Sequence, residues 1–408
     1  MITDKSQKYS HLSIELTKKI NKKEKKEQGI FFTPSETIDK SLLYLEPYFK
    51  DIKKVLEPSC GSCEYVNKLN SLPYEFNITA MELNKLIFES IEKYQSSQNN
   101  LVNDNFITYN FKETYDLIIG NPPYFVMKKN EVDSSYYEYF DGRPNIFILF
   151  IIKSLKLLAQ GGIVSFVLPK NFLNSLYYDK TRKYILQYFN ILNIINCVED
   201  KYLDTQQDTI ILIVRNETPK NNNLFSLEMS GYTVFGFQNN IEKIKTLYQN
   251  SKTLSELGFE VNVGNVVWNQ CKNQLTEDSS KTILIYSSDI KDNKLSIKKY
   301  PNKAKKNYID KDGDTSPVLV INRGYGVGSY NFNYCIINEN EERKYLVENH
   351  LICIRDSDTT DKNTLIDRYK KIIESFKNEK TKEFISLYFG NNAINTTELC
   401  KILPIYDI

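Results

Sequence analysis

The chain contains the stretch Tyr115-Asp116-Leu117-Ile118-Ile119-Gly120-Asn121-Pro122-Pro123-Tyr124. Its first part is an apolar run that ends at turn-forming residues, which is typical of a buried β-strand. The prolines fix φ and stiffen the turn. The Asn121 side-chain oxygen and the Pro122 carbonyl oxygen can accept both N–H bonds of an exocyclic amine, and Tyr124 can cover one face of its ring. Asn and Pro are also common turn residues, so a purely structural turn is the alternative.

The bulk composition is that of an ordinary globular protein. The chain has 408 residues, enough for two or three domains of about 150 residues each. Its hydrophobic content of 41%, charged content of 25% and net charge of +2 give no overall nucleic-acid signal, so any basic surface must be local. There is no apolar run of about 18 residues and no signal peptide. We therefore expect a cytoplasmic protein that does not associate with membranes.

Cysteine and histidine usage argues against metal and disulfide chemistry. The seven cysteines are odd in number and irregularly spaced, which favours reduced thiols. Cys60 and Cys63 match half of a redox or zinc motif, but no second cysteine pair completes it. The two histidines, His11 and His350, are far apart in the sequence, so a histidine-based triad or zinc site is not expected.

Strands and helices alternate along the first half of the chain. The expected strands are residues 53–57, 76–82, 115–120, 162–168, 191–198 and 209–214, and the expected helices are residues 62–70, 84–95, 145–159 and 175–189. This alternation predicts an α/β fold with a parallel, doubly wound sheet. Ligands of such sheets bind beyond the carboxyl ends of the strands.

Changes in composition along the sequence suggest four segments. Residues 1–28 are polar and lysine-rich, and we read them as a basic helical segment with a solvated face. Residues 29–215 form the alternating domain, and residues 216–224 are rich in Asn and read as a linker. Residues 225–408 predict a second, mixed α+β domain, with strands at 282–286, 318–322 and 334–337 and a helix at 363–377.

Polar side chains follow successive strands of the first domain. The first strand ends in Glu57, followed by small residues that let a ligand approach the backbone. The second ends in Glu82, about 25 residues further on, where such sheets bind ribose hydroxyls. Asp104 and Phe106 lie between the expected helix at 84–95 and the expected strand at 115–120, and they could supply an acceptor for a base amino group and an apolar wall. Each signal is weak by itself, and their order along the chain is what predicts a nucleotide-like cofactor.

These motifs resemble those of S-adenosylmethionine-dependent DNA adenine-N6 methyltransferases of type II restriction-modification systems, with the gamma order of motifs and a C-terminal target-recognition domain. The resemblance covers roughly residues 29–215 and implies a Rossmann-like methyltransferase sheet. It implies that cofactor contacts come from Thr33, Glu57, Ser59, Gly61, Glu82, Asp104, Phe106, Asn121 and Phe150. Cys63 stands where the family usually has glycine, and Asn105 separates Asp104 from Phe106, which the family often has adjacent.

The resemblance also implies the reaction. Asn121 and Pro122 would hold the adenine amino group for methylation, and Tyr124 and Tyr202 would stack on a base extruded from duplex DNA. We expect a monomer that needs no metal, with a possible cognate restriction endonuclease.

Basic residues in the second half predict the DNA contacts. Residues 291–306 contain seven lysines against one acid, and Arg323 opens a Gly-rich loop after an apolar strand. The candidate DNA-binding residues are Lys298, Lys299, Lys303, Lys305, Arg323 and Tyr325. A solvated face and a plain β-hairpin are the respective alternatives.

Three other functions stay open. A protein methyltransferase for a glutamine side chain uses a similar Asn-Pro-Pro-Tyr turn but would not need the basic second half. A cytosine-N4 methyltransferase more often has Ser in place of Asn121. A catalytically silent DNA-binding subunit would have no reason to keep a cofactor site.

Overall fold

The computed structural model divides into two compact units, Met1–Ile241 and Glu242–Ile408. It describes residues 8–200, 202–205, 207–220, 222–298, 300–302, 304–323, 332–356, 358–359, 361–389 and 394–407. None of the helices in these ranges combines the length and the apolar character that a membrane crossing requires.

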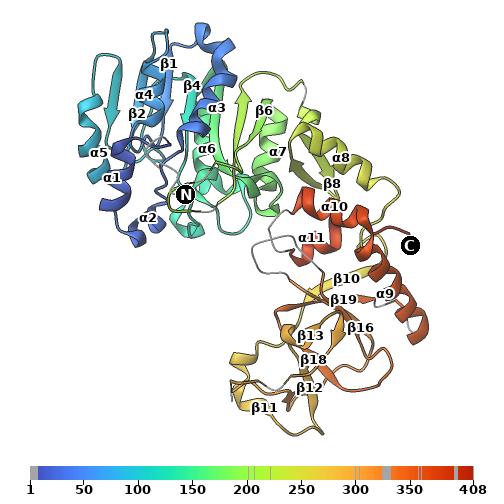
Figure 1. Cartoon of the computed structure of the whole chain (residues 1–408). Coiled ribbons are helices and arrows are strands. Elements are labelled where there is room, and N and C mark those ends of the chain that lie inside the picture. The colour runs from blue at the N-terminus through green and yellow to red at the C-terminus, as the bar shows by residue number, and fades with distance from the viewer. Residues whose placement is uncertain are drawn as a thin grey trace. The chain divides into compact units, whose positions relative to one another are not determined.

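The first unit is built on a seven-stranded sheet with the order β3-β2-β1-β4-β5-β7-β6 (Figure 1). Its strands are β1 Lys54–Glu57, β2 Asn77–Met81, β3 Asn99–Val102, β4 Tyr115–Gly120, β5 Leu158–Pro169, β6 Asn190–Asn196 and β7 Thr209–Arg215. Neighbouring strands from β3 to β5 pair in parallel. The chain order reverses between β1 and β4, and such a reversal is where doubly wound sheets bind their ligands.

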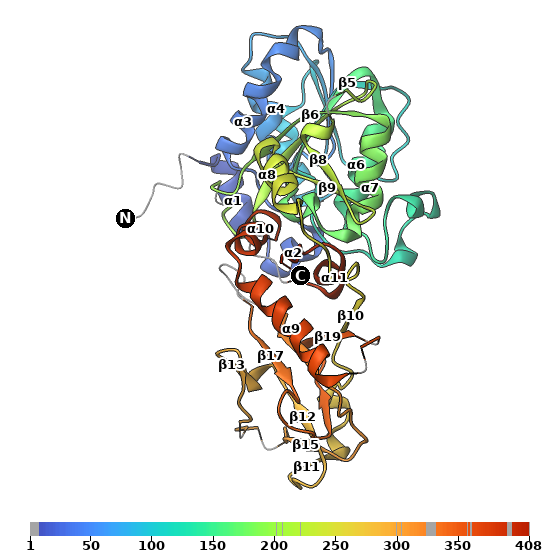
Figure 2. The ribbon, with the colours of Figure 1, turned by 90° about the vertical axis from the view of Figure 1, so that its right-hand side faces the viewer.

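Helices cover both faces of this sheet. They are α1 His11–Lys19, α2 Lys22–Gln28, α3 Ser35–Leu45, α4 Glu64–Asn70, α5 Lys85–Ile91, α6 Ile146–Leu157 and α7 Asp179–Tyr188. Figure 2 shows α3 and α4 on one side of the sheet and α6 and α7 on the other. Successive strand residues point to opposite faces, so Leu117 packs with the α3–α4 core and Ile118 with the α6–α7 core. Burial on both faces explains why these strands are almost continuously apolar.

The prediction of a doubly wound α/β sheet is confirmed, but the expectation that every strand runs parallel is wrong. β7 pairs antiparallel with both β5 and β6. The segment between β6 and β7 contains no helix in its described residues, so the chain turns back beside β6 without a crossover. A parallel neighbour would need such a crossover connection.

The division between the units falls within α8 (Gln238–Tyr248), C-terminal to the expected linker at residues 216–224. The reason is a hairpin of β8 (Ser226–Met229) and β9 (Tyr232–Phe235) that stays attached to the first unit. The buried Arg182 donates from Nε to the Thr233 carbonyl at 2.6 Å, and Asp179 accepts from the Thr233 N–H at 2.6 Å. These contacts tie the hairpin to α7.

The second unit contains two four-stranded sheets with the orders β10-β19-β16-β17 and β11-β15-β12-β18. Its strands are β10 Phe259–Val263, β11 Leu275–Thr276, β12 Thr282–Ile285, β13 Ile290–Lys291, β14 Lys294–Leu295, β15 Tyr308–Ile309, β16 Val318–Asn322, β17 Tyr334–Ile337, β18 Tyr345–Val347 and β19 Leu351–Asp356. Its helices are α9 Lys362–Lys377, α10 Glu379–Tyr388 and α11 Thr396–Lys401. The three strands and the helix predicted here are all present, which confirms a mixed α+β arrangement.

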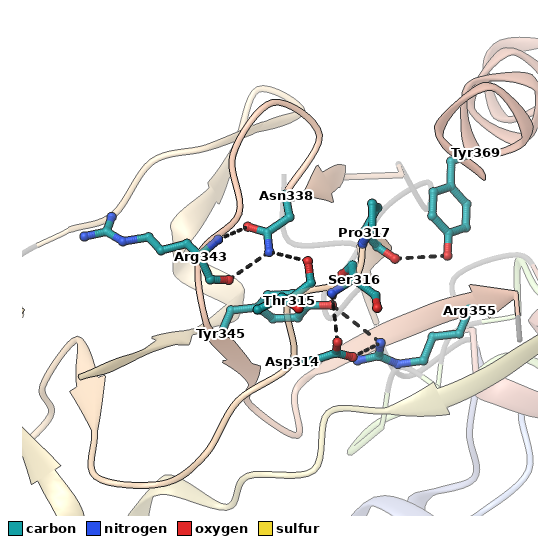
Figure 3. Close-up of polar contacts among 9 residues, drawn as sticks. All are labelled: Asp314, Thr315, Ser316, Pro317, Asn338, Arg343, Tyr345, Arg355 and Tyr369. Carbon is teal, nitrogen blue, oxygen red and sulfur yellow. Dashed lines mark hydrogen bonds and ion pairs between the residues drawn. The ribbon is translucent and has the colours of Figure 1, made fainter. Parts of the chain in front are cut away.

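Side chains from several elements fix the loop that leads into β16 (Figure 3). Arg355 of β19 pairs with Asp314 at 2.7 Å, and the Tyr345 hydroxyl donates to the Ser316 carbonyl at 2.7 Å. The Asn338 amide nitrogen donates to the Thr315 and Arg343 carbonyls, each at 2.8 Å. The Thr315 and Ser316 carbonyls are therefore satisfied by side chains, whereas the Asp314 backbone pairs with that of Tyr345.

We predict that Arg182→Leu strongly destabilises the first unit. Besides Thr233, the buried guanidinium donates to the carbonyls of Phe172 and Ser175, and all three acceptors would lose this donor. We expect the free energy of unfolding, measured by urea denaturation, to fall by about 3 kcal/mol or more. Lys180→Leu, on the exposed side of α7, should cost less than about 1 kcal/mol. Equal losses would contradict the assigned role of Arg182.

Candidate active site

A cavity of about 740 Å³ lies at the carboxyl ends of the central strands, and we call it the cofactor cavity. Seven of the nine predicted cofactor residues line it: Ser59, Gly61, Glu82, Asp104, Phe106, Asn121 and Phe150. The other two, Thr33 and Glu57, are buried and are not among the lining residues. Loops after four neighbouring strands thus meet at one place, as expected for a doubly wound sheet.

The turn after β1 and the tip of β2 are joined by Glu82. Its Oε2 accepts from the Gly61 N–H at 3.0 Å, and its Oε1 accepts from the Asn84 N–H at 2.7 Å. Burial raises the pKa of Glu82 to about 7, although these backbone hydrogen bonds lower it in part. Each carboxylate oxygen keeps a further lone pair, so hydroxyl groups of a ligand can still bind there.

Cys63 explains one departure from the expected motif. It lies in the left-handed region with φ of 62°, at the position before α4 begins. That region favours glycine, which is the residue usually found at this position in the family that the motif resembles. Cys63 is buried, and its thiol sits in the α3–α4 core.

An aromatic wall stands beside Asp104. The rings of Phe106 and Phe150 have centroids 4.8 Å apart, and Lys153 Nζ lies 5.3 Å from the Phe106 ring centroid. The Asp104 carboxylate accepts the N–H of Asn105 at 2.6 Å. This combination of an exposed acceptor and an apolar wall suits a planar base that carries an amino group.

Glu57 is a buried carboxyl group with an unpaired oxygen. Its Oε2 has no hydrogen-bond partner among the described residues, and its side chain lies against Gly120. Burial raises the pKa of Glu57 well above its ordinary value, with a further contribution from nearby Cys63 and Glu64. The raised pKa favours the neutral form of this carboxyl group, which does not line the cavity.

The Asn121 amide is held from both ends. Its Nδ2 donates to the Phe31 carbonyl at 3.2 Å, and its Oδ1 accepts from the Tyr124 hydroxyl at 2.7 Å. A carbonyl can only accept, so the nitrogen must face Phe31 and the oxygen must face Tyr124. The Tyr124 hydroxyl also reaches the Val167 carbonyl of β5 at 2.8 Å. The orientation of the amide is therefore fixed before any substrate binds.

Gly29 is a positioning residue that sequence reasoning missed. It ends α2 in the left-handed conformation, with φ of +66°. A Cβ atom there would lie 2.6 Å from the Tyr124 backbone nitrogen, far inside contact distance. Only glycine lets the segment carrying Phe31 approach the Asn-Pro-Pro-Tyr turn so closely. A glycine placed directly after a lysine-rich helix was the available signal.

Tyr202, the predicted second stacking residue, does not line the cofactor cavity. It is 9% exposed and lines a second cavity of about 940 Å³, which also includes Phe31. Phe31 lines both cavities, so they adjoin at this residue. The pKa of Tyr124 is raised mainly by burial, with a smaller contribution from Tyr202. Stacking of Tyr202 on a base stays a prediction.

The structure describes three of the six predicted DNA-binding residues, Lys298, Lys305 and Arg323. Lys298 is exposed, and Arg323 directly follows β16. The structure gives Lys305 an internal contact, because its Nζ lies 4.0 Å from the Tyr286 ring centroid and 4.2 Å from that of Tyr300. The remaining candidates, Lys299, Lys303 and Tyr325, lie outside the described residues. β16 and β17, which precede and follow this segment in the sequence, pair antiparallel.

All seven cysteines are free thiols. Within the described ranges, no three His, Cys, Asp or Glu side chains come together in a group that could hold a metal ion.

Comparisons with known proteins find sequence and structural similarity to methyltransferases. The Eco57I restriction-modification methylase family model matches residues 5–203, which include every residue lining the cofactor cavity. The chain is 26% identical to the type II methyltransferase M.CvrRI of Paramecium bursaria Chlorella virus XZ-6E, over 97% of this chain and 98% of that protein. It is 24% identical to the modification methylase CviBIII of Paramecium bursaria Chlorella virus NC1A, over 98% and 99%. A solved structure of a putative class I S-adenosylmethionine-dependent methyltransferase from Listeria monocytogenes matches with a TM-score of 0.42 and 16% identity, over 52% of this chain and 68% of that one.

We predict that Gly29→Ala destabilises the turn at Tyr124. The added methyl group is both in a strained conformation and in collision with the Tyr124 nitrogen, so we expect a loss of roughly 2–3 kcal/mol in unfolding free energy. Gly231→Ala is the matched control, because Gly231 has φ of +78° but a Cβ there would meet nothing within 4 Å. It should show only the conformational strain, about 1 kcal/mol. Indistinguishable losses from the two variants would rule out the steric contact.

Proposed function

We propose that this chain, whose residues 5–203 match the Eco57I restriction-modification methylase family model, is a DNA methyltransferase that acts on the N6 amino group of adenine. The methyl donor is S-adenosylmethionine, and the substrate is duplex DNA. The observation that carries the proposal is the Asn121 amide, whose oxygen is oriented by Phe31 and Tyr124 at the edge of the cofactor cavity.

The described residues of the cofactor cavity fit S-adenosylmethionine in each of its parts. Glu82 would accept from the ribose hydroxyls, and Asp104 would accept from the adenine amino group beside the wall of Phe106 and Phe150. The Ser59–Gly61 turn would hold the methionine end, and the buried Glu57 and Thr33 do not line the cavity. When bound, the donor supplies an electrophilic methyl group on a sulfonium centre.

The role of Asn121 follows from the chemistry of the adenine amino group. The N6 lone pair is delocalised into the ring, so this nitrogen is a poor nucleophile. The Asn121 Oδ1 and the Pro122 carbonyl accept its two N–H bonds, and this pulls the nitrogen towards a geometry in which the lone pair is localised. Oδ1 retains a lone pair for this purpose after accepting from Tyr124. Because these acceptors are already in position, they stabilise the transition state without a cost for reorganisation.

The target base must leave the double helix to reach Asn121. Extrusion costs about a few kcal/mol of lost stacking and pairing. The Tyr124 ring, and the Tyr202 ring in the adjoining cavity, are the aromatic groups that compensate, at roughly 1–3 kcal/mol per stacked base. In the second unit, the exposed Lys298 and Arg323, which directly follows β16, are candidate DNA contacts.

We predict that Asn121→Ala abolishes methyl transfer while cofactor affinity stays within about threefold of wild type. Transfer of labelled methyl groups to DNA and calorimetric titration with S-adenosylmethionine measure the two effects separately. Asn100→Ala, at an exposed position on β3, is the matched control and should keep full activity. A parallel loss of both quantities in Asn121→Ala would instead indicate a role in folding or cofactor binding.

The same assay separates the competing activities. Labelled donor is incubated in parallel with DNA, with RNA and with a glutamine-bearing protein, and the modified nucleosides are then identified. The proposal requires N6-methyladenine in DNA. N4-methylcytosine, a labelled glutamine or no transfer at all would each favour one of the alternatives. Sequencing the modified bases of a host that expresses the chain also gives the recognition sequence.

We predict that cofactor binding weakens as pH falls through about 7. Glu82 accepts hydrogen bonds best when ionised, and its pKa of about 7 means that it becomes protonated below this pH. The dissociation constant of S-adenosylmethionine should rise by up to about tenfold for each pH unit below that value. Glu82→Gln should bind weakly at every pH, with no inflection near 7. An unchanged inflection in this variant would assign the titration to another group.

A further inference from the structure

The N-terminal helix α2 lies between the two cavities of the first unit. Glu27 and Gln28, at its C-terminal end, line the cofactor cavity, whereas Lys22, Lys25 and Lys26 line the second cavity. The second cavity also holds Tyr202 and adjoins the first at Phe31, whose carbonyl binds the Asn121 amide. The lysine side of α2 therefore faces the cavity next to the amide that would hold the target base.

The three lysines differ in whether an acidic side chain pairs with them. Lys25 is buried, pairs with Asp204 and donates to the Thr17 carbonyl at 2.8 Å, so it is part of the fold. Lys22 and Lys26 are exposed and have no ion pair with any described residue. They lie four residues apart and so share one face of the helix, where two like charges repel each other. Two neighbouring lysines without an acidic partner favour the binding of an anion that is not part of the chain.

The carboxylates of the same cavity are mostly neutralised. Asp200 pairs with Lys40 at 2.6 Å and accepts from the Thr37 hydroxyl at 2.8 Å, and Asp204 pairs with Lys25. Asp208 is the lining carboxylate for which the described residues provide no ion pair. Two uncompensated lysines thus face one uncompensated aspartate.

We propose that Lys22 and Lys26 bind the DNA phosphates that flank the extruded nucleotide. This rests on the proposed function and assigns the second cavity to the DNA side of the reaction. The sugar–phosphate backbone must pass close to Asn121 when a base is delivered there. The negative charge of a nucleotide is on its phosphate group, and lysines can bind this group while the base lies at Asn121. Such contacts hold the strand in place and carry no sequence information.

The test compares two double variants with equal loss of charge. Lys22→Ala with Lys26→Ala removes the proposed contacts. Lys18→Ala with Lys23→Ala removes two exposed lysines of the same α1–α2 segment that do not line the cavity. DNA affinity is measured between about 50 and 200 mM salt on a duplex that contains the methylation site found by sequencing. Cofactor affinity and the unfolding midpoint of each variant report whether the fold is intact.

We expect the Lys22/Lys26 variant to bind DNA about tenfold more weakly at the middle of this range. The slope of log K against log salt should become shallower by about 2, one for each lost phosphate contact. The Lys18/Lys23 variant should change the slope by less than about half a unit. Wild-type affinity and slope in the Lys22/Lys26 variant, or equal effects of the two variants, would overturn the assignment. Failure of the wild type to methylate DNA would overturn the proposed function itself, which is a different result.

Discussion

The geometry of the site depends on the hydrogen bonds of one amide, that of Asn121. Its partners come from segments far apart in the sequence: the Phe31 carbonyl, the Tyr124 hydroxyl and, through that hydroxyl, the Val167 carbonyl of β5. The Tyr124 hydroxyl has one proton and two acceptors, Asn121 Oδ1 and Val167 O, at nearly equal distances. When a substrate donor binds to Oδ1, the Tyr124 hydroxyl can donate to the Val167 carbonyl instead. The hydroxyl group then still makes one hydrogen bond. The amide is thus rigid in direction and still available to a substrate.

The sheet is what makes this convergence possible. Parallel pairing of β1, β2, β3 and β4 brings their carboxyl ends to one edge, and burial of alternate residues against α3–α4 and α6–α7 fixes the register. A slip of one residue in β4 would exchange Leu117 and Ile118 between the two cores. It would also move Asn121 away from Phe31. Stability of the core and precision of the site are therefore set by the same pairing.

Sequence reasoning succeeded where local pattern decides the structure and failed where distant contacts do. The apolar run of β4 and the three strands foreseen in the second unit are present because such runs have few alternatives to burial. The antiparallel direction of β7 and the attachment of the β8–β9 hairpin depend on contacts such as Arg182 with Thr233, which no local pattern encodes. Gly29 was missed for the same reason, since its requirement arises from Tyr124. The basic run around Lys305 predicted an exposed phosphate contact, but neighbouring aromatic rings hold that ammonium group.

The two buried carboxyl groups bear on which ligand the first unit prefers. Burial raises the pKa values of both Glu57 and Glu82, and the Glu82 carboxylate makes a smaller contribution to the shift of Glu57. For Glu82, whose ordinary pKa of 4.5 is raised to about 7, protonation stabilises the folded state below pH 4.5, and this contribution is lost as pH rises through 7. Above that range the buried Glu82 carboxylate is ionised. A ligand that offers hydroxyl donors to Glu82 relieves this cost, whereas an anionic ligand would increase it. The electrostatics of this site therefore disfavour an anionic ligand at the strand edge that carries Asn121.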